Sequence, residues 1–219
     1  MPLDLPLPLI YPITSGATTA QTTPDSPQFV NILQLVQAAV AAKVSLFQIR
    51  EKSLTARVLY ELTARAAEIT RGSQTRLLVN DRSDIARAAG ADGVHLTTHS
   101  LPPEVVRRMY GAEFLLGVST HSLEAAREAA KGGADFVVFG PVFETESKRV
   151  YGEPLGLAKL REVTGELGEF PVLAIGGITL DNVEKCFEAG ASGVAAIRLL
   201  NDVAGLESIA EKIRNGYRS

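Results

Sequence analysis

Short apolar runs alternate with longer amphipathic stretches along most of the chain. The run VSLFQIR, residues 44–50, is typical of a strand buried on both faces, whereas Leu59, Leu62, Ala66 and Ile69 recur at helical spacing. The runs that predict strands are residues 8–14, 44–50, 76–80, 93–96, 114–119, 136–140, 171–177 and 193–199. The stretches that predict helices are residues 27–42, 54–71, 83–89, 103–109, 122–131, 156–166, 180–189 and 205–215.

Eight strands that alternate with eight helices predict an α/β fold, a (β/α)8 TIM barrel formed as a single domain by residues 1–219. The alternative is a doubly wound open sheet, but no predicted strand is followed by a GxGxxG fingerprint. No linker divides the chain. The one loose stretch, residues 15–28, is a long first βα loop and, by its position, a plausible lid.

Three junctions repeat one pattern: AAGADGVHL at 88–96, KGGADFVVFG at 131–140 and EAGASGVAAI at 188–197. Each is a helix end, a glycine, an Ala-Asp or Ala-Ser pair and then an apolar strand. A glycine after a helix adopts the left-handed conformation at low cost and ends the helix. The recurrence indicates βα modules.

Composition limits the classes of partner. The net charge is −3 and the pI is about 5.7, so we expect neither nucleic acid nor an anionic membrane as the main partner. Cys186 is the single cysteine, which predicts no disulfide framework and no thiolate metal site and fits a reducing cytoplasm. The first 16 residues have no basic segment and no long apolar run, so we predict no signal peptide and no transmembrane helix.

The active site of a TIM barrel lies on the loops that follow the strands, so the polar residues at the strand ends are the candidates. Gln48, Arg50 and Lys52 fall two apart and therefore point to one side of an extended backbone. Cations at several strand ends predict a site for a phosphate or diphosphate in a chain that is acidic overall. These cations are Arg50, Lys52, Arg82, Lys148 and Arg198.

Several candidates also have a structural interpretation. Arg50 and Glu51 could form a salt bridge at the rim, and Asp81 could begin the next helix as a cap instead of holding a metal. His121 and Ser122 could cap the helix that follows them.

Three further residues are not expected to take part in catalysis. We expect His95 to pack inside the barrel, His99 to face solvent and Cys186 to be inert core.

Gly176 and Gly177 follow the seventh predicted strand. Glycine there allows close approach of a ligand to backbone N–H groups, and the loops after strands 7 and 8 are the usual phosphate site of a barrel. Together with residues 193–198, the pair indicates a phosphate site.

Six motifs in order resemble the thiamine phosphate synthase family and its sister branch, the thiazole tautomerases. They are FQIREK (47–52), VNDR (79–82), GADGVHL (90–96), LGVSTHSLEAA (116–126), GADFVVFGPVFETESK (133–148) and PVLAIGGIT (171–179). The resemblance implies a transferase that joins a hydroxymethylpyrimidine diphosphate to a thiazole phosphate and releases diphosphate with the help of Mg²⁺. Barrels of this kind often form homodimers.

The resemblance also implies roles for individual residues. Gln48 matches the residue that orients the aminopyrimidine, Ser119 a hydroxyl near the reacting bridge, and Asp81 a metal-binding carboxylate. The residues that bind the diphosphate in the family are matched here by Arg50, Lys52, Asn80 and Lys148. The hydroxyls of Thr145 and Ser147 match the pair that meets the thiazole in the family. Gly177 and Ile197 match the backbone donors to the thiazole phosphate.

Two positions depart from the family pattern. Where synthases have Gly-Gln-x-Asp, with a second carboxylate for Mg²⁺, residues 97–100 read Thr-Thr-His-Ser, so Ser100 replaces that carboxylate. Arg198 stands where a serine is usual, and could grip a phosphate or fill the pocket. The alternatives are therefore a metal-free thiazole tautomerase that uses His121, and a non-catalytic paralogue that binds thiazole or thiamine phosphate.

Overall fold

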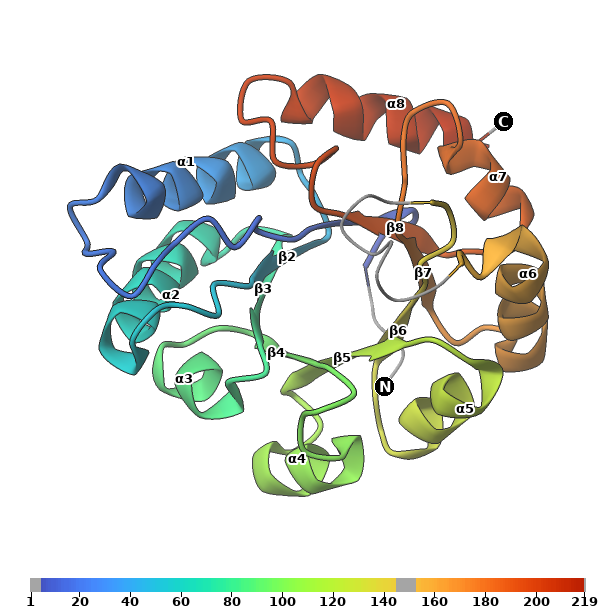
Figure 1. Cartoon of the computed structure of the whole chain (residues 1–219), viewed down its shortest axis with the longest axis horizontal. Coiled ribbons are helices and arrows are strands. Elements are labelled where there is room, and N and C mark those ends of the chain that lie inside the picture. Colours follow the sequence, from blue (N-terminus) through green and yellow to red (C-terminus); the bar gives the residue numbers. More distant parts are fainter. Residues whose placement is uncertain (1–4, 145–152, 219) are drawn as a thin grey trace.

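Eight parallel strands form a ring inside a layer of helices in the described part of the chain (Figure 1). The structure is a computed structural model that describes residues 5–144 and 153–218. The strands are β1 (Leu9–Pro12), β2 (Leu46–Ile49), β3 (Arg76–Asn80), β4 (Gly93–Leu96), β5 (Leu115–Thr120), β6 (Phe136–Phe139), β7 (Val172–Ile175) and β8 (Gly193–Ala196). The helices are α1 (Pro27–Ala41), α2 (Ala56–Thr70), α3 (Ser83–Ala88), α4 (Pro103–Tyr110), α5 (Leu123–Lys131), α6 (Gly156–Leu167), α7 (Val183–Glu188) and α8 (Leu206–Arg218).

The sheet is nearly closed into a barrel. Its strands follow the order β1-β8-β7-β6-β5-β4-β3-β2, and β1 meets β2 through one bridge between Ile13 and Gln48. Beside that bridge, the Thr14 N–H donates to the Gln48 carbonyl at 3.0 Å. This arrangement confirms the predicted α/β barrel. Because the strands are parallel, the loops after them all lie at one mouth.

Most predicted element bounds agree with the structure to within a few residues, and α7 shows why some do not. The sequence predicts this helix over 180–189, but it begins at Val183. The Asn182 side chain accepts from the Thr179 N–H and donates to the Gly177 carbonyl, both at 2.9 Å. These bonds hold residues 177–182 in a turn. Likewise β1, predicted over 8–14, ends at Pro12, where its pairing with β8 ends at Ala196.

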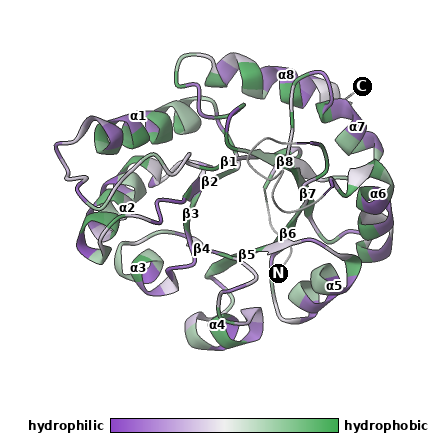
Figure 2. Ribbon diagram, in the orientation of Figure 1, coloured by the Kyte–Doolittle hydropathy of each residue, from purple (hydrophilic) through white to green (hydrophobic). Residues whose placement is uncertain are grey.

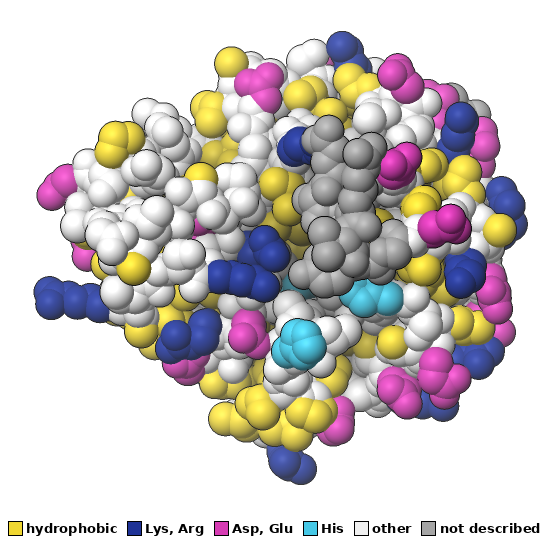
Figure 3. Space-filling view, viewed as in Figure 1, with side chains coloured by type: hydrophobic (Ala, Val, Ile, Leu, Met, Phe, Trp, Pro, Cys, Tyr) yellow, Lys and Arg dark blue, Asp and Glu magenta, His cyan; other side chains and the backbone are white. Residues whose placement is uncertain are grey.

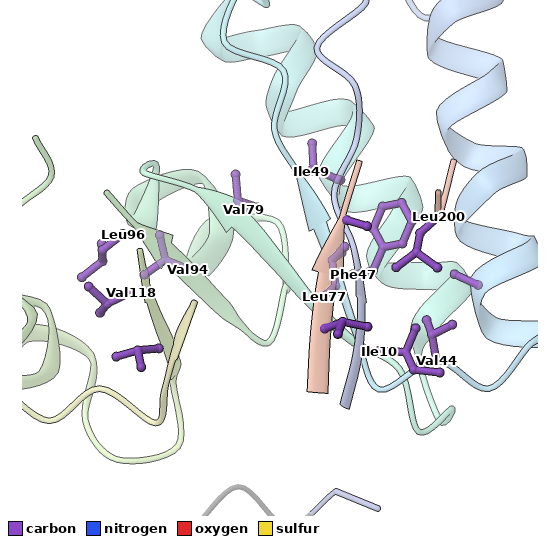
Figure 4. Packing of buried hydrophobic residues seen from close by; sticks show 14 of the residues in the cluster. Ile10, Val44, Phe47, Ile49, Leu77, Val79, Val94, Leu96, Val118 and Leu200 are labelled. Carbon is purple, nitrogen blue, oxygen red and sulfur yellow. The ribbon is translucent and has the colours of Figure 1, made fainter. Parts of the chain in front are cut away.

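Alternate residues of each strand face two apolar layers. The inner layer lies inside the ring and contains Leu9, Tyr11, Ile13, Leu46, Leu78, Phe136, Val138, Leu173 and Ala195. The outer layer packs the strands against the helices, and Figure 4 shows some of its residues, Ile10, Phe47 and Leu77 among them. The helices carry hydrophobic and hydrophilic sides, as expected of helices with one face on the barrel (Figure 2).

The repeated junctions have a structural explanation. The Asp92 N–H donates to the Leu77 carbonyl at 2.9 Å, and the Asp92 carboxylate accepts from the Leu77 N–H at 2.8 Å. Asp135 makes the same two bonds to Leu116, at 2.8 and 2.7 Å. The aspartate of each Gly-Ala-Asp unit therefore joins the start of its own strand to the preceding strand. In the third junction only the backbone bond remains, from the Ser192 N–H to the Val172 carbonyl.

Of the helices described, none is both long enough and apolar enough to span a bilayer.

Candidate active site

The polar row at the end of β2 leads from the barrel interior to its mouth. Gln48 is 1% exposed, and its Nε2 donates to the Tyr11 hydroxyl at 2.9 Å. The Arg50 N–H donates to Thr14 Oγ1 at 2.8 Å, and the Arg50 residue is half-buried. Lys52 is exposed. The predicted spacing therefore places an amide inside the barrel and two cations progressively nearer to solvent.

Arg50 and Glu51 do not form the alternative rim salt bridge within the described residues. Glu51 is buried, and its carboxylate accepts from the N–H groups of Gly16 and Thr18 at 3.1 Å each and from the Thr18 hydroxyl at 2.6 Å. Glu51 therefore anchors the β1–α1 loop, which has buried side chains of its own at Thr18 and Thr22. The loop is fixed at its start, which its loose composition did not suggest.

A chain of hydrogen bonds continues inward from Gln48. The Tyr11 hydroxyl lies 3.2 Å from His95 Nδ1, and His95 Nε2 lies 2.8 Å from Ser119 Oγ. Burial and, to a smaller extent, the positive charge of Arg50 lower the pKa of His95 from 6.5 to about 3, so the imidazole is neutral. His95 is inside the barrel, as predicted, but it also links two polar residues. The role of Tyr11 was missed, although a buried tyrosine on the inner face of a strand usually has a hydrogen-bond partner.

Two residues pack around the His95 ring. The ring centroid of Phe136 lies 6.2 Å from that of His95. A Cβ at position 117 would lie 2.4 Å from Phe136 Cζ and 2.8 Å from His95 Nδ1. Gly117 therefore makes room for both rings.

Ser119 lies near the end of β5, and His121 directly follows that strand. Ser119 is half-buried and His121 is exposed. His121 Nδ1 donates to the Gly140 carbonyl, which leaves Nε2 of a neutral ring as the acceptor. Ser122 caps α5, since its Oγ accepts from the Ala125 N–H at 3.2 Å. The cap interpretation is therefore confirmed for Ser122 and not for His121.

Asp81 lies across the mouth and is not a helix cap. Arg82 occupies the N-cap position of α3, without a side-chain capping bond. The Asp81 N–H donates to the His95 carbonyl at 2.9 Å, and Asp81 Oδ1 accepts from the Ser100 hydroxyl at 2.5 Å. The position that departs from the family pattern is thus in direct contact with the predicted metal ligand.

The neighbours of Asp81 differ in what they can offer a ligand. Asn80 is half-buried and pairs in register with His95. Arg82 donates to both oxygens of Asp84, at 2.8 and 2.6 Å, and this hydrogen bonding raises the pKa of Arg82. Because Arg82 is already paired with a carboxylate, it contributes less to the cationic ring than predicted.

The glycine pair after β7 is crowded by the chain itself. A Cβ on Gly176 would lie 2.5 Å from Pro141 Cβ, and one on Gly177 would lie 2.5 Å from the Glu144 carbonyl oxygen. Both glycines have positive φ, +98° and +64°. They are thus needed for packing of the β6–α6 loop, whatever ligand the Gly177 N–H meets.

The end of β8 is tied to β1. Asn201 Nδ2 donates to the carbonyls of Ile197, at 2.5 Å, and Ile13, at 2.7 Å, and Arg198 is exposed. Figure 3 shows Lys and Arg side chains and histidines gathered toward the centre of this face. Thr145, Ser147 and Lys148 lie outside the described residues.

His99 and Cys186 lie where the sequence predicts them, at the surface and in the core. His99 is exposed in the β4–α4 loop. Cys186 is fully buried, and burial raises the pKa of its thiol to about 12.

Comparisons with known proteins identify the family. The model of the thiamine monophosphate synthase family, TMP-TENI, matches residues 19–200. The chain belongs to this family. The chain is 47% identical to a putative thiamine-phosphate synthase of Geobacter sulfurreducens over 76% of this chain and 78% of that protein. It is 40% identical to the thiamine-phosphate synthase of Moorella thermoacetica over 83% of this chain and 86% of that protein.

A solved structure supports the same assignment. Thiamine phosphate pyrophosphorylase from Pyrococcus furiosus superposes with a TM-score of 0.77 and 29% identity, over 96% of each chain. Together the thiamine monophosphate synthase relatives support a biosynthetic transferase with the activity of a thiamine-phosphate synthase.

This family generally uses Mg²⁺, an ion that takes oxygen ligands. Within residues 5–144 and 153–218, no group of three or more His, Cys, Asp or Glu side chains could hold a metal ion. Asp81 offers one carboxylate, of which Oδ1 already accepts from Ser100. Mg²⁺ commonly binds through one or two carboxylates together with substrate phosphates. The donor set therefore fits an ion that arrives with a diphosphate and does not fit an ion held by the protein alone.

Proposed function

We propose that this protein makes thiamine phosphate by joining a hydroxymethylpyrimidine diphosphate to a thiazole phosphate, with release of diphosphate. The observation that carries the proposal is the row of Gln48, Arg50 and Lys52, which runs from the barrel interior to the mouth in a chain of this family. Ser119 lies across the barrel from this row.

The interior amide suits the pyrimidine. Because Gln48 Nε2 donates to Tyr11, its Oε1 is the atom left to accept from the exocyclic amino group of the pyrimidine. The buried Phe136 ring would form part of the apolar floor beneath it. The diphosphate would then point toward the mouth, where Arg50, Lys52 and Asn80 supply donors and positive charge, with Lys148 as a further proposed clamp residue.

The reaction needs no protein nucleophile. The bond between the pyrimidine methylene carbon and the bridging oxygen breaks, and its electron pair leaves with the diphosphate. The thiazole nitrogen then donates its lone pair to the same carbon to form the new C–N bond. Arg50 and Lys52 stabilise the negative charge that develops on the leaving group, and the contacts to the thiazole phosphate hold the nitrogen in line with the breaking bond.

Asp81 would hold Mg²⁺ together with diphosphate oxygens, and the ion would add positive charge against the leaving group. For the thiazole phosphate, we propose the backbone N–H groups of Gly177 and Ile197, with Arg198 beside them and the hydroxyls of Thr145 and Ser147 nearer the ring. We further expect a cytoplasmic protein with small phosphorylated substrates, and a homodimer that size-exclusion chromatography with light scattering would detect.

The test is a synthase assay with both phosphorylated precursors, with and without Mg²⁺. The proposal predicts thiamine phosphate and diphosphate in equal amounts, at a rate that rises with Mg²⁺. Absence of product with both substrates and excess Mg²⁺ would end this proposal.

One observation favours a second candidate, the thiazole tautomerase. His121 is held by the Gly140 carbonyl with Nε2 as its acceptor, the arrangement expected of a general base. The same preparation, in EDTA with the thiazole carboxylate phosphate in D₂O, would then exchange the ring proton. A His121→Asn variant separates the two activities, because it should abolish the exchange and leave condensation measurable.

A further inference from the structure

Four side chains from four strands form one continuous hydrogen-bonded chain across the inside of the barrel. The chain runs from Gln48 on β2 through Tyr11 on β1 and His95 on β4 to Ser119 on β5, with contacts of 2.9, 3.2 and 2.8 Å. Gln48, Tyr11 and His95 are at most 2% exposed, whereas Ser119 is half-buried and faces the mouth. Of the four side chains, that of Ser119 is therefore the most accessible, and Gln48 can meet only a group that enters the barrel.

The direction of the first bond determines the second. Gln48 donates through Nε2, so the Tyr11 oxygen accepts there. Burial raises the pKa of the Tyr11 phenol above its usual value, and the phenol keeps its one proton. The partner left for that proton is His95 Nδ1, which must then be the unprotonated nitrogen of the ring.

The third bond follows from the second. His95 is buried, and no ion pair among the described residues gives it a carboxylate to stabilise an imidazolium. A neutral ring whose Nδ1 accepts carries its hydrogen on Nε2, so His95 donates to Ser119 Oγ. Packing of the ring against Phe136 and the glycine at position 117 prevents it from rotating freely.

Ser119 thereby receives a hydrogen bond from inside the barrel. Its own hydroxyl hydrogen is then directed away from His95, toward the mouth. Without this chain the serine could equally donate to His95 and present only a lone pair to the ligand.

We propose that Tyr11 and His95 are positioning residues that fix the Ser119 hydroxyl as a hydrogen-bond donor to the oxygen of the leaving diphosphate. The proposal rests on the synthase function, and it deepens that function by assigning two residues that do not touch the substrate. A donor at that oxygen stabilises charge that grows as the C–O bond breaks, so its loss should lower kcat more than it raises KM.

Nuclear magnetic resonance tests the chain itself, without substrate. In protein labelled with ¹⁵N-histidine, the long-range ¹H–¹⁵N pattern of each ring shows which nitrogen carries the hydrogen. The three histidines are assigned with His99→Gln and His121→Gln variants. We expect His95 in the native protein to be neutral with its hydrogen on Nε2, and this preference to be lost in Tyr11→Phe. A hydrogen on Nδ1 in the native protein would overturn the proposal, and no variant is needed for that result.

Kinetics test the consequence for Ser119. Tyr11→Phe should lower kcat of the synthase reaction by about tenfold, the effect of one misdirected hydrogen bond, and should raise KM for the pyrimidine diphosphate by a smaller factor, because Gln48 also loses its acceptor. Tyr60→Phe, which removes a hydroxyl from the exposed face of α2, is the matched control and should leave both constants unchanged. In a Ser119→Ala background Tyr11→Phe should cause no further loss of kcat, because the Ser119 hydroxyl through which Tyr11 acts is absent.

The outcomes separate the two proposals. A further tenfold loss in the double variant would show that Tyr11 acts independently of Ser119 and would overturn the positioning role. If the native protein makes no thiamine phosphate but His95 carries its hydrogen on Nε2, the proposed function has failed and the hydrogen-bonded chain stands. If the protein is an active synthase and His95 carries its hydrogen on Nδ1, the proposed function stands and the positioning role of Tyr11 and His95 has failed.

Discussion

Ser100 donates a hydrogen bond to Asp81, with 2.5 Å between Ser100 Oγ and Asp81 Oδ1. Ser100 also accepts from the Thr97 N–H at 2.8 Å, so its hydroxyl is held in place by the turn after β4. A hydroxyl at this position stabilises the Asp81 carboxylate by a hydrogen bond, whereas a carboxylate there would repel it. The contact explains how Asp81 is held at a mouth where Ser100 stands in place of the family's second carboxylate.

Ser100→Asp should therefore tighten Mg²⁺ binding. We expect roughly tenfold higher affinity in the presence of diphosphate, because affinity for hard cations rises with the charge of the ligands. Isothermal titration of Mg²⁺ into protein saturated with diphosphate measures this effect. Ser100→Ala, which removes the donor without adding charge, is the control and should not gain affinity. Equal affinities of the native and Ser100→Asp proteins would show that Asp81 does not contribute to a metal site.

Lys52→Ala should weaken binding of the pyrimidine diphosphate by about 1–3 kcal/mol, the range for loss of a charged hydrogen bond. The measurement is titration with a non-reacting diphosphate analogue. Lys212→Ala, an exposed change on α8, serves as the control for overall charge. An affinity unchanged by Lys52→Ala would mean that the polar row ends at Arg50.

Glu51→Ala should destabilise the protein by about 3 kcal/mol, because it leaves the N–H groups of Gly16 and Thr18 without their acceptor. Urea unfolding followed by circular dichroism gives the change in free energy. Glu61→Ala on α2 is the matched comparison, since Glu61 pairs with Arg65 at an exposed site and should lose no more than about 0.5 kcal/mol. Similar losses in the two variants would contradict an anchoring role for Glu51.

Gly117→Ala should also destabilise the protein, by about 1–3 kcal/mol, because the added methyl group overlaps Phe136 and His95. Gly165→Ala in α6 is the matched comparison and should have the opposite effect on stability, since nothing lies within 4 Å of a Cβ there and alanine is the better helix former. That change should stabilise the protein by about 0.5–1 kcal/mol. The same unfolding experiment compares the two, and a neutral Gly117→Ala would mean that the rings can move apart.

The barrel and its polar row could be predicted because both are local properties of the chain. Apolar runs and two-residue alternation place Gln48 and Arg50 on the inner side of β2 without knowledge of any neighbour. The contacts of Tyr11 could not be predicted in this way, because its partners Gln48 and His95 lie 37 and 84 residues away in sequence. Only the register of the closed sheet brings them together.

The glycine pair illustrates a different limit. Gly176 and Gly177 follow a strand, as predicted, but their crowding comes from the β6–α6 loop, which the sequence does not place against them. The role of Glu51 is hidden in the same way. Its place beside Arg50 in sequence suggests an ion pair, but its carboxylate accepts from the N–H of Thr18 in the β1–α1 loop. In both cases a loop from elsewhere in the chain determines the role of a residue.

The neutral His95 predicts how stability depends on pH. Its pKa is about 3 in the folded protein and 6.5 when unfolded, so the unfolded chain binds the extra proton between these values. The contribution of the neutral His95 ring to the free energy of unfolding is fully present above pH 6.5 and is lost as the pH falls toward 3. Between pH 7 and pH 5 the free energy of unfolding should fall by about 2 kcal/mol more in the native protein than in a His95→Gln variant.

Urea unfolding at pH 7, 6 and 5 provides this comparison. His99→Gln is the matched control, because His99 is exposed in the β4–α4 loop and its loss should leave the pH dependence as in the native protein. If His95→Gln showed the same fall as the native protein, His95 would take up a proton without unfolding. It could not then be the neutral ring that joins Tyr11 to Ser119.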